Sequence, residues 1–367
     1  MVESTLSGPD GPGQWLTRFA AGVDSLALAA ARTLLDRTVM PRPHELDRLR
    51  SSADFYLRPE LQDEPRRFFE FLDTPLEIPE VSLSSKRPRA KNSERFSLVF
   101  PSAYEPSHPE YRHEHAAQDE NHIARAELWL HPDSEARGTW IGLHGFAMGN
   151  PSFDAPALMA SSFFALGLDV ALFTLPLHGP RKPRGSRFSG QLFTSPNVAR
   201  LNEAIGQAVH DLALLIAWLR SRNDRPVGLM GLSLGGYVAA LMASLLEDLD
   251  FVIPMAAPVC FGDLAFRFMS ASRHYRRQPS AGMDAEELRD AYRIHSPLAH
   301  PPRVPRERLM IVAGRGDRIV PTEHPSRLWD HWGQPRIHWF GGSHIVPFGR
   351  RRICEEIARF LREIEIV

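Results

Sequence analysis

A short run of residues, Gly231-Leu232-Ser233-Leu234-Gly235, constrains the fold of this chain more than any other feature of its sequence. An apolar, strand-like stretch precedes the run and an Ala-rich, helix-like stretch follows it. A sharp turn between a strand and a helix can lift a serine out of the backbone and present its hydroxyl group as a nucleophile. Glycines flank such a turn because it leaves no room for side chains on either side. The run therefore predicts a nucleophile at Ser233.

From Ser93 onward, short apolar runs alternate with helix-like segments. This alternation is typical of crossover units that build a mostly parallel sheet. The clearest helix spans Val198 to Leu219, where apolar residues recur at steps of three and four and form one buried stripe. We expect an α/β fold with helices around eight strands, near Phe96–Phe100, Ala124–Leu130, Thr139–Leu143, Val170–Phe173, Val227–Met230, Phe251–Pro254, Leu309–Val312 and Arg336–Phe340.

The N-terminal part of the chain has a different pattern of apolar residues. Helix-like segments cover Trp15 to Thr38 and His44 to Tyr56, and no strand pattern is evident before Ser93. We therefore expect a helical N-terminal extension, a candidate cap, over residues 1–92 and a catalytic domain over residues 93–367. Within that domain, residues 260–297 are a candidate lid insertion, with a plain pair of surface helices as the alternative.

A serine hydroxyl needs a base within hydrogen-bond reach, and the base needs a partner that fixes its tautomer. Two residues in Gly-containing turns meet these needs, since each follows a predicted strand directly: Asp317 after Leu309–Val312 and His344 after Arg336–Phe340. The order serine, acid, histidine along the chain is the one expected of an α/β hydrolase. The sequence thus predicts a catalytic triad of Ser233, Asp317 and His344.

Several other acids and histidines compete for these roles. Asp263 is the main rival for the acid, because it follows the strand after the nucleophile helix, whereas Asp250 lies at the wrong end of that strand. His210 and Asp211 lie within the long helix, where we expect them to face solvent or to cap a neighbouring turn. His338 lies within a predicted strand, so we expect it to be packed or exposed rather than catalytic.

The oxyanion formed by nucleophilic attack needs preorganised donors, usually backbone amides. One should be the N–H of Leu234, directly after the nucleophile. The other should follow an early strand, and His144-Gly145-Phe146 follows Thr139–Leu143 in that place, so we expect the N–H of Phe146. His144 itself is expected to shape this loop through hydrogen bonds rather than to act as a base.

These motifs resemble the α/β-hydrolase superfamily from about residue 93 to the C-terminus: the His-Gly-Phe loop, the elbow at Ser233, the Gly-Asp-Arg-Ile-Val-Pro loop at Asp317 and the Gly-Ser-His at His344. The α/β-hydrolase domain-containing group numbered eighteen, whose members carry an N-terminal extension, is also similar to this chain in three features taken together: the segment from Pro176 to Pro183, the long helix after Asn197 and the run from Gly231 to Tyr237. Relatives in that group often have a cysteine where this chain has Pro180, so no role for a thiol carries over.

The superfamily resemblance implies a serine hydrolase that works through an acyl-enzyme without cofactor or metal. We expect the cleavage of a carboxylic ester, with a small-molecule or lipid acyl group as substrate. Two alternatives stay open: a peptidase or acyltransferase that uses the same triad, and a non-catalytic binding protein on the same fold.

Composition limits the partners and the compartment. The 43 basic and 44 acidic residues leave a formal charge of −1, so no global field favours nucleic acid. The two cysteines, Cys260 and Cys354, indicate neither a disulfide framework nor a metal site, and we expect both to be buried packing residues.

Without a secretory signal pattern or a spanning segment, cytoplasmic residence is expected. The amphipathic segment Trp15 to Met40 is expected to pack on the catalytic domain, with membrane-surface contact as the less favoured alternative.

Overall fold

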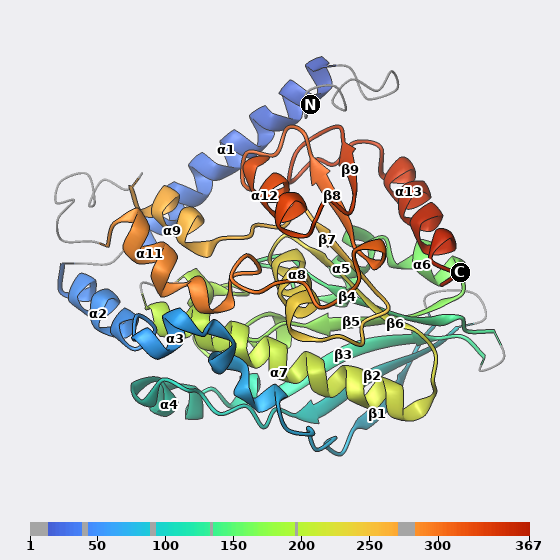
Figure 1. Ribbon diagram of the computed structural model, residues 1–367, viewed down its shortest axis with the longest axis horizontal. Helices are drawn as coiled ribbons and strands as arrows, with labels where there is room; N and C mark the ends of the chain where they lie inside the picture. Colours follow the sequence, from blue (N-terminus) through green and yellow to red (C-terminus); the bar gives the residue numbers. More distant parts are fainter. Residues whose placement is uncertain (1–13, 39–42, 89–92, 133–134, 195–196, 271–282) are drawn as a thin grey trace.

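The computed structural model describes residues 14–38, 43–88, 93–132, 135–194, 197–270 and 283–367, and for residues 30–38 and 43–48 the backbone alone. Helices dominate the N-terminal part and alternate with strands in the rest of the chain (Figure 1). The strands are β1 (Ser82–Lys86), β2 (Glu94–Pro101), β3 (Ile123–Leu130), β4 (Gly138–Leu143), β5 (Leu168–Thr174), β6 (Val227–Leu232), β7 (Phe251–Met255), β8 (Met310–Gly314) and β9 (Arg336–Phe340).

The helices match the predicted pattern, including the two N-terminal segments and the long helix. They are α1 (Gln14–Thr38), α2 (Pro43–Asp54), α3 (Pro59–Asp63), α4 (Pro109–Ala116), α5 (Pro151–Ala157), α6 (Ala160–Ala165), α7 (Val198–Arg222), α8 (Leu234–Leu245), α9 (Phe261–Ser270), α11 (Ala285–Ala291), α12 (Glu323–His331) and α13 (Arg350–Glu363). The aromatic-rich segment Pro65–Leu72 forms a short 3-10 helix. Among the described residues, no helix combines the length and the apolar character needed to cross a bilayer.

The strands of the described residues form one sheet of nine, in the order β1-β2-β3-β5-β4-β6-β7-β8-β9. The pairs β1-β2, β2-β3 and β3-β5 are antiparallel, and the other pairs are parallel. The prediction of a mostly parallel sheet is confirmed, and each of the eight predicted strands is present. The strand count was wrong by one, because the edge strand β1 is exposed along its whole length and so carries no apolar alternation.

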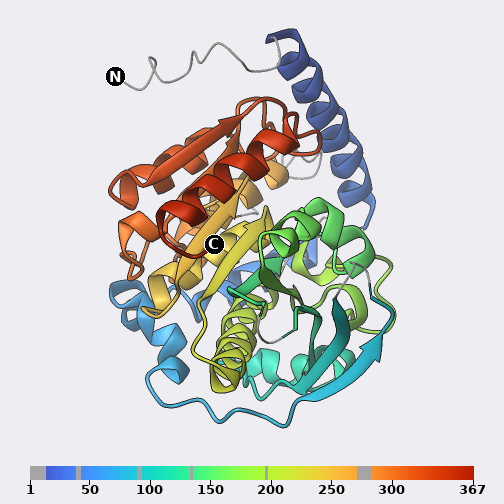
Figure 2. The ribbon, with the colours of Figure 1, turned by 90° about the vertical axis from the view of Figure 1, so that its right-hand side faces the viewer.

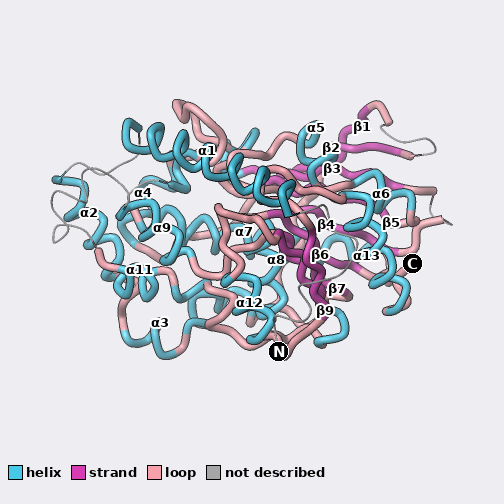
Figure 3. The backbone as a smooth tube through the Cα atoms, turned by 90° about the horizontal axis from the view of Figure 1, so that it is seen from above, coloured by secondary structure: helices cyan, strands magenta, loops and turns pink. Residues whose placement is uncertain are grey.

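Helices cover both faces of this sheet (Figure 2). Each face has its own apolar core. On one face, α7 and α8 pack on strand residues such as Ile141 and Leu229. On the other face, α6 and α13 pack on Trp140 and Met230. These two residues are the sequence neighbours of Ile141 and Leu229. Side chains therefore alternate between the two cores along each buried strand, as strand geometry requires. Figure 3 shows β4, β6 and β7 among helices and β1 at the outer edge of the molecule.

The parallel half of the sheet brings the ends of distant strands together. Strands β4, β6, β7, β8 and β9 run side by side in the same direction. Their carboxyl ends therefore meet at one edge of the sheet, where α/β proteins hold their ligands. The turns after β4, β6, β8 and β9 carry the residues that the sequence singled out.

Candidate active site

Ser233 occupies a strained turn between β6 and α8. Its backbone has φ 54° and ψ −113°, a conformation that non-glycine residues rarely adopt. The neighbouring glycines allow this turn because a Cβ atom on Gly231 would lie 2.0 Å from the Gly235 carbonyl oxygen, and a Cβ atom on Gly235 would lie 2.1 Å from that of Leu143. The N–H of Ser233 donates to the Met255 carbonyl oxygen at 2.8 Å, which anchors the turn to β7.

The structure brings Ser233, His344 and Asp317 into one hydrogen-bonded series. The Ser233 hydroxyl Oγ lies 2.9 Å from His344 Nε2, and His344 Nδ1 lies 2.7 Å from Asp317 Oδ2. The other oxygen of Asp317 accepts from the N–H groups of Ile319 (2.9 Å) and Val320 (2.7 Å), so the carboxylate is fixed in orientation. An imidazole placed between a hydroxyl and a carboxylate can take the hydroxyl proton as a general base.

The electrostatics of His344 suit that role. Burial alone would lower the pKa of the imidazole, but the carboxylates of Asp317 and Asp24 outweigh burial and raise it above its usual value. A raised pKa reflects stabilisation of the imidazolium ion, which would form when the serine proton is transferred. The Asp317 side chain is almost fully buried and that of His344 is mostly buried, so water screens their interaction only weakly.

The loop after β4 lies against the serine turn. A Cβ atom on Gly145 would lie 3.6 Å from the Cβ atom of Ser233, which places His144-Gly145-Phe146 beside that serine. Leu234 is the first residue of α8, so its N–H has no acceptor within that helix. Both amides that the sequence suggested as oxyanion donors, Phe146 and Leu234, thus belong to segments next to Ser233.

His144 is a neutral structural residue. Its Nδ1 donates to the Gly145 carbonyl oxygen (2.8 Å), and its Nε2 accepts from the N–H of Leu175 (3.1 Å). Complete burial lowers its pKa to about 4, so the ring keeps one proton at neutral pH. This arrangement fixes the loop after β4 to the loop after β5, so His144 has a structural role.

The rival acids lie elsewhere. Asp263, on α9, accepts from Arg289 of α11 (2.6 Å) and Arg327 of α12 (2.8 Å) and so joins three helices. Asp250 accepts from the N–H of Val227 at 2.8 Å, at the opposite end of β6 from the serine. These partners hold both carboxylates away from the imidazole of His344. Within residues 260–297, the structure describes α9 and α11, whereas the basic cluster Arg273, His274, Arg276 and Arg277 lies outside the described residues.

The expectation for His210 and Asp211 was wrong, because both side chains are buried. Asp211 Oδ2 accepts from Arg181 Nη2 at 2.7 Å, and both of these side chains are fully buried. Ser102 donates to the other oxygen of Asp211 at 2.7 Å. The loop from Pro176 to Pro183 is therefore held to α7 by a buried ion pair. His338, in β9, is partly buried, and burial lowers its pKa.

One residue next to the site was missed. Asp24, on α1, is fully buried and accepts hydrogen bonds from the N–H groups of Arg318, His344 and Ile345. In the sequence it merely interrupts an apolar segment. The sequence did carry one signal, since Asp24 is an acidic residue among the apolar positions of an amphipathic helix. Charged residues are rarely buried unless they are paired, so such a position indicates a buried partner.

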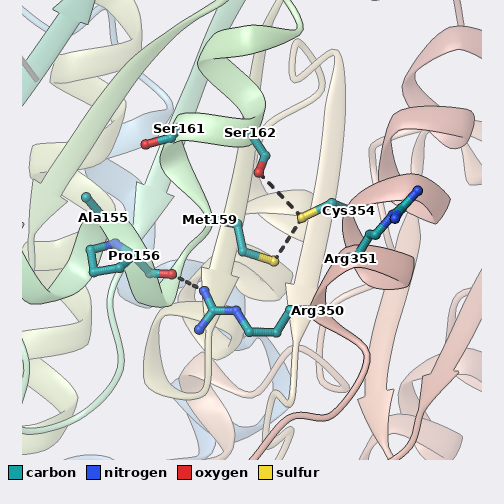
Figure 4. Close-up of a pocket in the computed structure, with 8 residues that line it drawn as sticks. All are labelled: Ala155, Pro156, Met159, Ser161, Ser162, Arg350, Arg351 and Cys354. Atoms are coloured by element: carbon teal, nitrogen blue, oxygen red, sulfur yellow. Dashed lines mark hydrogen bonds between the residues drawn. The ribbon is translucent and has the colours of Figure 1, made fainter. Parts of the chain in front are cut away.

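A surface hollow of about 420 Å³ lies apart from the triad, between the α5–α6 segment and α13 (Figure 4). Cys354 lines it together with Met159 and Ser162, and its Sγ lies 3.3 Å from Met159 Sδ. The prediction of buried packing holds for Cys260 but was wrong for Cys354, which is partly exposed. Neither Ser233 nor His344 lines this hollow.

Comparisons with known proteins show which proteins this chain is similar to. A family model described as serine hydrolase (FSH1) matches residues 200–354, a stretch that contains Ser233, Asp317 and His344. Over 336 residues, the chain is 32% identical to the uncharacterized protein Rv2627c of Mycobacterium tuberculosis (strain ATCC 25618 / H37Rv), covering 89% of this chain and 77% of that protein. The chain belongs to the Rv2627c family.

Solved structures give the fold of this Rv2627c family member. An acetyl xylan esterase from Paenibacillus sp. R4 matches with a TM-score of 0.56 at 12% identity, over 83% of this chain and 93% of that one. Acetyl xylan esterase 1 from Thermoanaerobacterium sp. JW/SL YS485 matches with a TM-score of 0.57 at 16% identity, over 84% and 94%. The predicted α/β-hydrolase fold and superfamily are confirmed, and the serine hydrolase model confirms the prediction of a hydrolase.

Proposed function

We propose that this protein is a serine esterase that cleaves a carboxylic ester through an acyl-enzyme intermediate, with Ser233 as nucleophile, His344 as general base and Asp317 as the acid of the triad. The observation that carries the proposal is the hydrogen-bonded series from the Ser233 hydroxyl through the imidazole to the Asp317 carboxylate, at 2.9 and 2.7 Å. The two acetyl xylan esterases of similar fold add support by analogy, since both are esterases.

In the first half of the reaction, Ser233 Oγ forms a bond to the carbonyl carbon of the ester while its proton passes to His344 Nε2. The carbonyl oxygen becomes an oxyanion, which the N–H groups of Leu234 and Phe146 stabilise. When the tetrahedral intermediate collapses, the bond to the alkoxy group breaks, and this group leaves as an alcohol with the proton from His344. The acyl group stays on Ser233.

In the second half, a water molecule attacks the acyl carbon. His344 takes a proton from this water, and the second oxyanion is held by the same two amides. Collapse breaks the bond to Ser233 Oγ, which recovers its proton from His344, and a carboxylic acid is released. No step in this sequence requires a metal or a cofactor.

Apolar side chains at the site favour an acyl group as the recognised part of the substrate. Phe146, which carries one proposed oxyanion amide, is 38% exposed, and Ile345, next to the proposed base, is 48% exposed. Such exposed apolar surface beside a nucleophile can contact an acyl chain. A small-molecule or lipid ester is therefore the proposed substrate class, and the finer resemblance to the group numbered eighteen stays a prediction.

The test is hydrolysis of p-nitrophenyl esters of increasing acyl length, together with labelling by a fluorophosphonate probe. Ser233→Ala should abolish both, while circular dichroism and the melting temperature show a folded protein. Ser221→Ala is the matched control, because it removes an exposed hydroxyl group that bonds only to a carbonyl oxygen of its own helix, and it should retain full activity. Labelling that persists in Ser233→Ala would overturn the proposal.

A further inference from the structure

Helix α1 lies on the outside of the molecule beside the loops that follow β8 and β9 (Figures 1 and 2). It is far from these loops in sequence, yet one side chain of the helix reaches into them. Asp24 is fully buried there, and its carboxylate faces backbone N–H groups of both loops. A buried carboxylate is costly unless hydrogen bonds satisfy it, so these contacts are specific.

The three hydrogen bonds of Asp24 join the two loops to each other. Oδ2 accepts from the N–H of Arg318, directly after the triad acid, at 3.0 Å and from the N–H of His344 itself at 2.9 Å. Oδ1 accepts from the N–H of Ile345 at 3.1 Å. A single oxygen atom therefore receives donors from the acid loop and from the histidine loop, which fixes the distance between them.

The backbone of α1 also closes on the acid loop. A Cβ atom on Gly316 would lie 2.9 Å from the Thr17 carbonyl oxygen and 2.7 Å from that of Gly342. The N–H of Gly316 donates to the Gly342 carbonyl oxygen at 2.7 Å. Only glycine allows helix, acid loop and histidine loop to approach this closely, so α1 is packed where the two loops meet.

We propose that Asp24 is a positioning residue of the active site, through which helix α1 holds the loops of Asp317 and His344 in the relative position that places the imidazole on the Ser233 hydroxyl. This inference rests on the proposed function. It assigns part of the N-terminal extension to the catalytic machinery, since the triad is held in place by a residue outside the hydrolase domain that the sequence predicted.

Asp24 also acts on His344 through its charge. Among the described residues, the charged groups that act on this imidazole are Asp317, from the loop after β8, and Asp24, from α1. Both carboxylates raise the pKa of His344 against the effect of burial. Neutralising Asp24 should therefore move the titration of His344 to lower pH, which a purely structural role for α1 would not do.

The experiment compares Asp24→Ala and Asp24→Asn in the full chain. Alanine removes both acceptor oxygens and with them all three hydrogen bonds. We expect fluorophosphonate labelling and kcat to fall about 10- to 100-fold with little change in KM, because small misplacements of a base have such effects. Asparagine can keep one oxygen on the N–H groups of Arg318 and His344, so its loss should be smaller. In both variants, the titration midpoint of the His344 ring by NMR should shift to lower pH.

Glu203→Gln is the matched control, because it neutralises another buried carboxylate, which accepts hydrogen bonds from Tyr56 and Tyr104 on a different part of the fold. It should reduce stability without moving the His344 titration. If Asp24→Ala does not fold, Asp24→Asn carries the test. An unchanged His344 midpoint, or labelling at the wild-type rate in folded Asp24→Ala, would overturn the inference.

The two proposals fail in different ways. If the wild-type protein shows neither esterase activity nor labelling, the proposed function falls, while the NMR titration of His344 still decides whether Asp24 acts on the imidazole. If the wild-type protein is active and both Asp24 variants match it, the function stands and the positioning role falls.

Discussion

The substitution Asp317→Asn separates the two roles proposed for this acid, which are to orient the imidazole and to stabilise its charge. Asparagine keeps an oxygen that can accept from the N–H groups of Ile319 and Val320, so the side chain retains its position. Its NH₂ group then replaces the oxygen that lies 2.7 Å from His344 Nδ1. A donor at this place forces Nδ1 to become an acceptor, which leaves the ring proton on Nε2, facing the Ser233 hydroxyl.

An imidazole in that tautomer cannot take the serine proton. In serine proteases, the corresponding change lowers kcat about 10⁴-fold, which equals roughly 5 kcal/mol of transition-state stabilisation. We expect a loss of this size here, because the same order of hydroxyl, imidazole and carboxylate is present. Since the asparagine side chain would retain its backbone contacts, the free energy of unfolding should change by less than about 2 kcal/mol.

The assay is p-nitrophenyl ester hydrolysis with active-site titration, so that kcat refers to folded, competent enzyme. Asp263→Asn is the matched control, because it removes the charge of the rival acid, which bonds to Arg289 and Arg327 instead of to the imidazole. Its kcat should stay within about threefold of wild type. A loss below tenfold in Asp317→Asn, or a larger loss in Asp263→Asn, would refute the reasoning.

The same contacts support three further predictions. Burial lowers the pKa of His344, but the carboxylates beside it raise this pKa by more. A protonated imidazole cannot act as a base, so kcat/KM should fall as the pH decreases. The midpoint of this fall should lie above the usual imidazole pKa of about 6.5. Gly235→Ala should lose fluorophosphonate labelling and about 1–3 kcal/mol of stability in urea unfolding, since its Cβ atom would lie 2.1 Å from the Leu143 carbonyl oxygen. Arg181→Met should lower the free energy of unfolding by about 3–5 kcal/mol in the same assay, because it leaves the buried carboxylate of Asp211 without its partner. Adding Asp211→Asn should recover part of this stability.

Much of the fold could be predicted because its signals are local. A buried parallel strand needs an unbroken apolar run, and β4, β5, β6 and β7 each have one that the sequence displays directly. Strand β1 could not be found in this way, since an edge strand that is exposed throughout is held by backbone hydrogen bonds to β2 rather than by apolar side chains.

That the three residues of the proposed triad lie together could be predicted for a related reason. Ser233, Asp317 and His344 each follow a strand of the parallel half of the sheet in a Gly-containing turn, so strand direction alone brings them to one edge. Asp211 was misjudged because its partner, Arg181, lies on a loop whose path no periodicity describes. Burial of a charge depends on a tertiary partner, and a single sequence does not show which distant residue supplies it.

Asp24, at the site itself, also has partners that a single sequence does not show. Its partners are 294 to 321 residues away, and they are backbone N–H groups, which carry no side-chain signature. The carboxylate is stable in the interior only while those N–H groups face it, and the two loops are joined only while the carboxylate is present. Docking of α1 and the arrangement of the two loops therefore stabilise each other, because the three hydrogen bonds that join them are lost when they separate. The N-terminal helix is thus linked thermodynamically to the geometry of the triad, although it contributes no atom to the proposed chemistry.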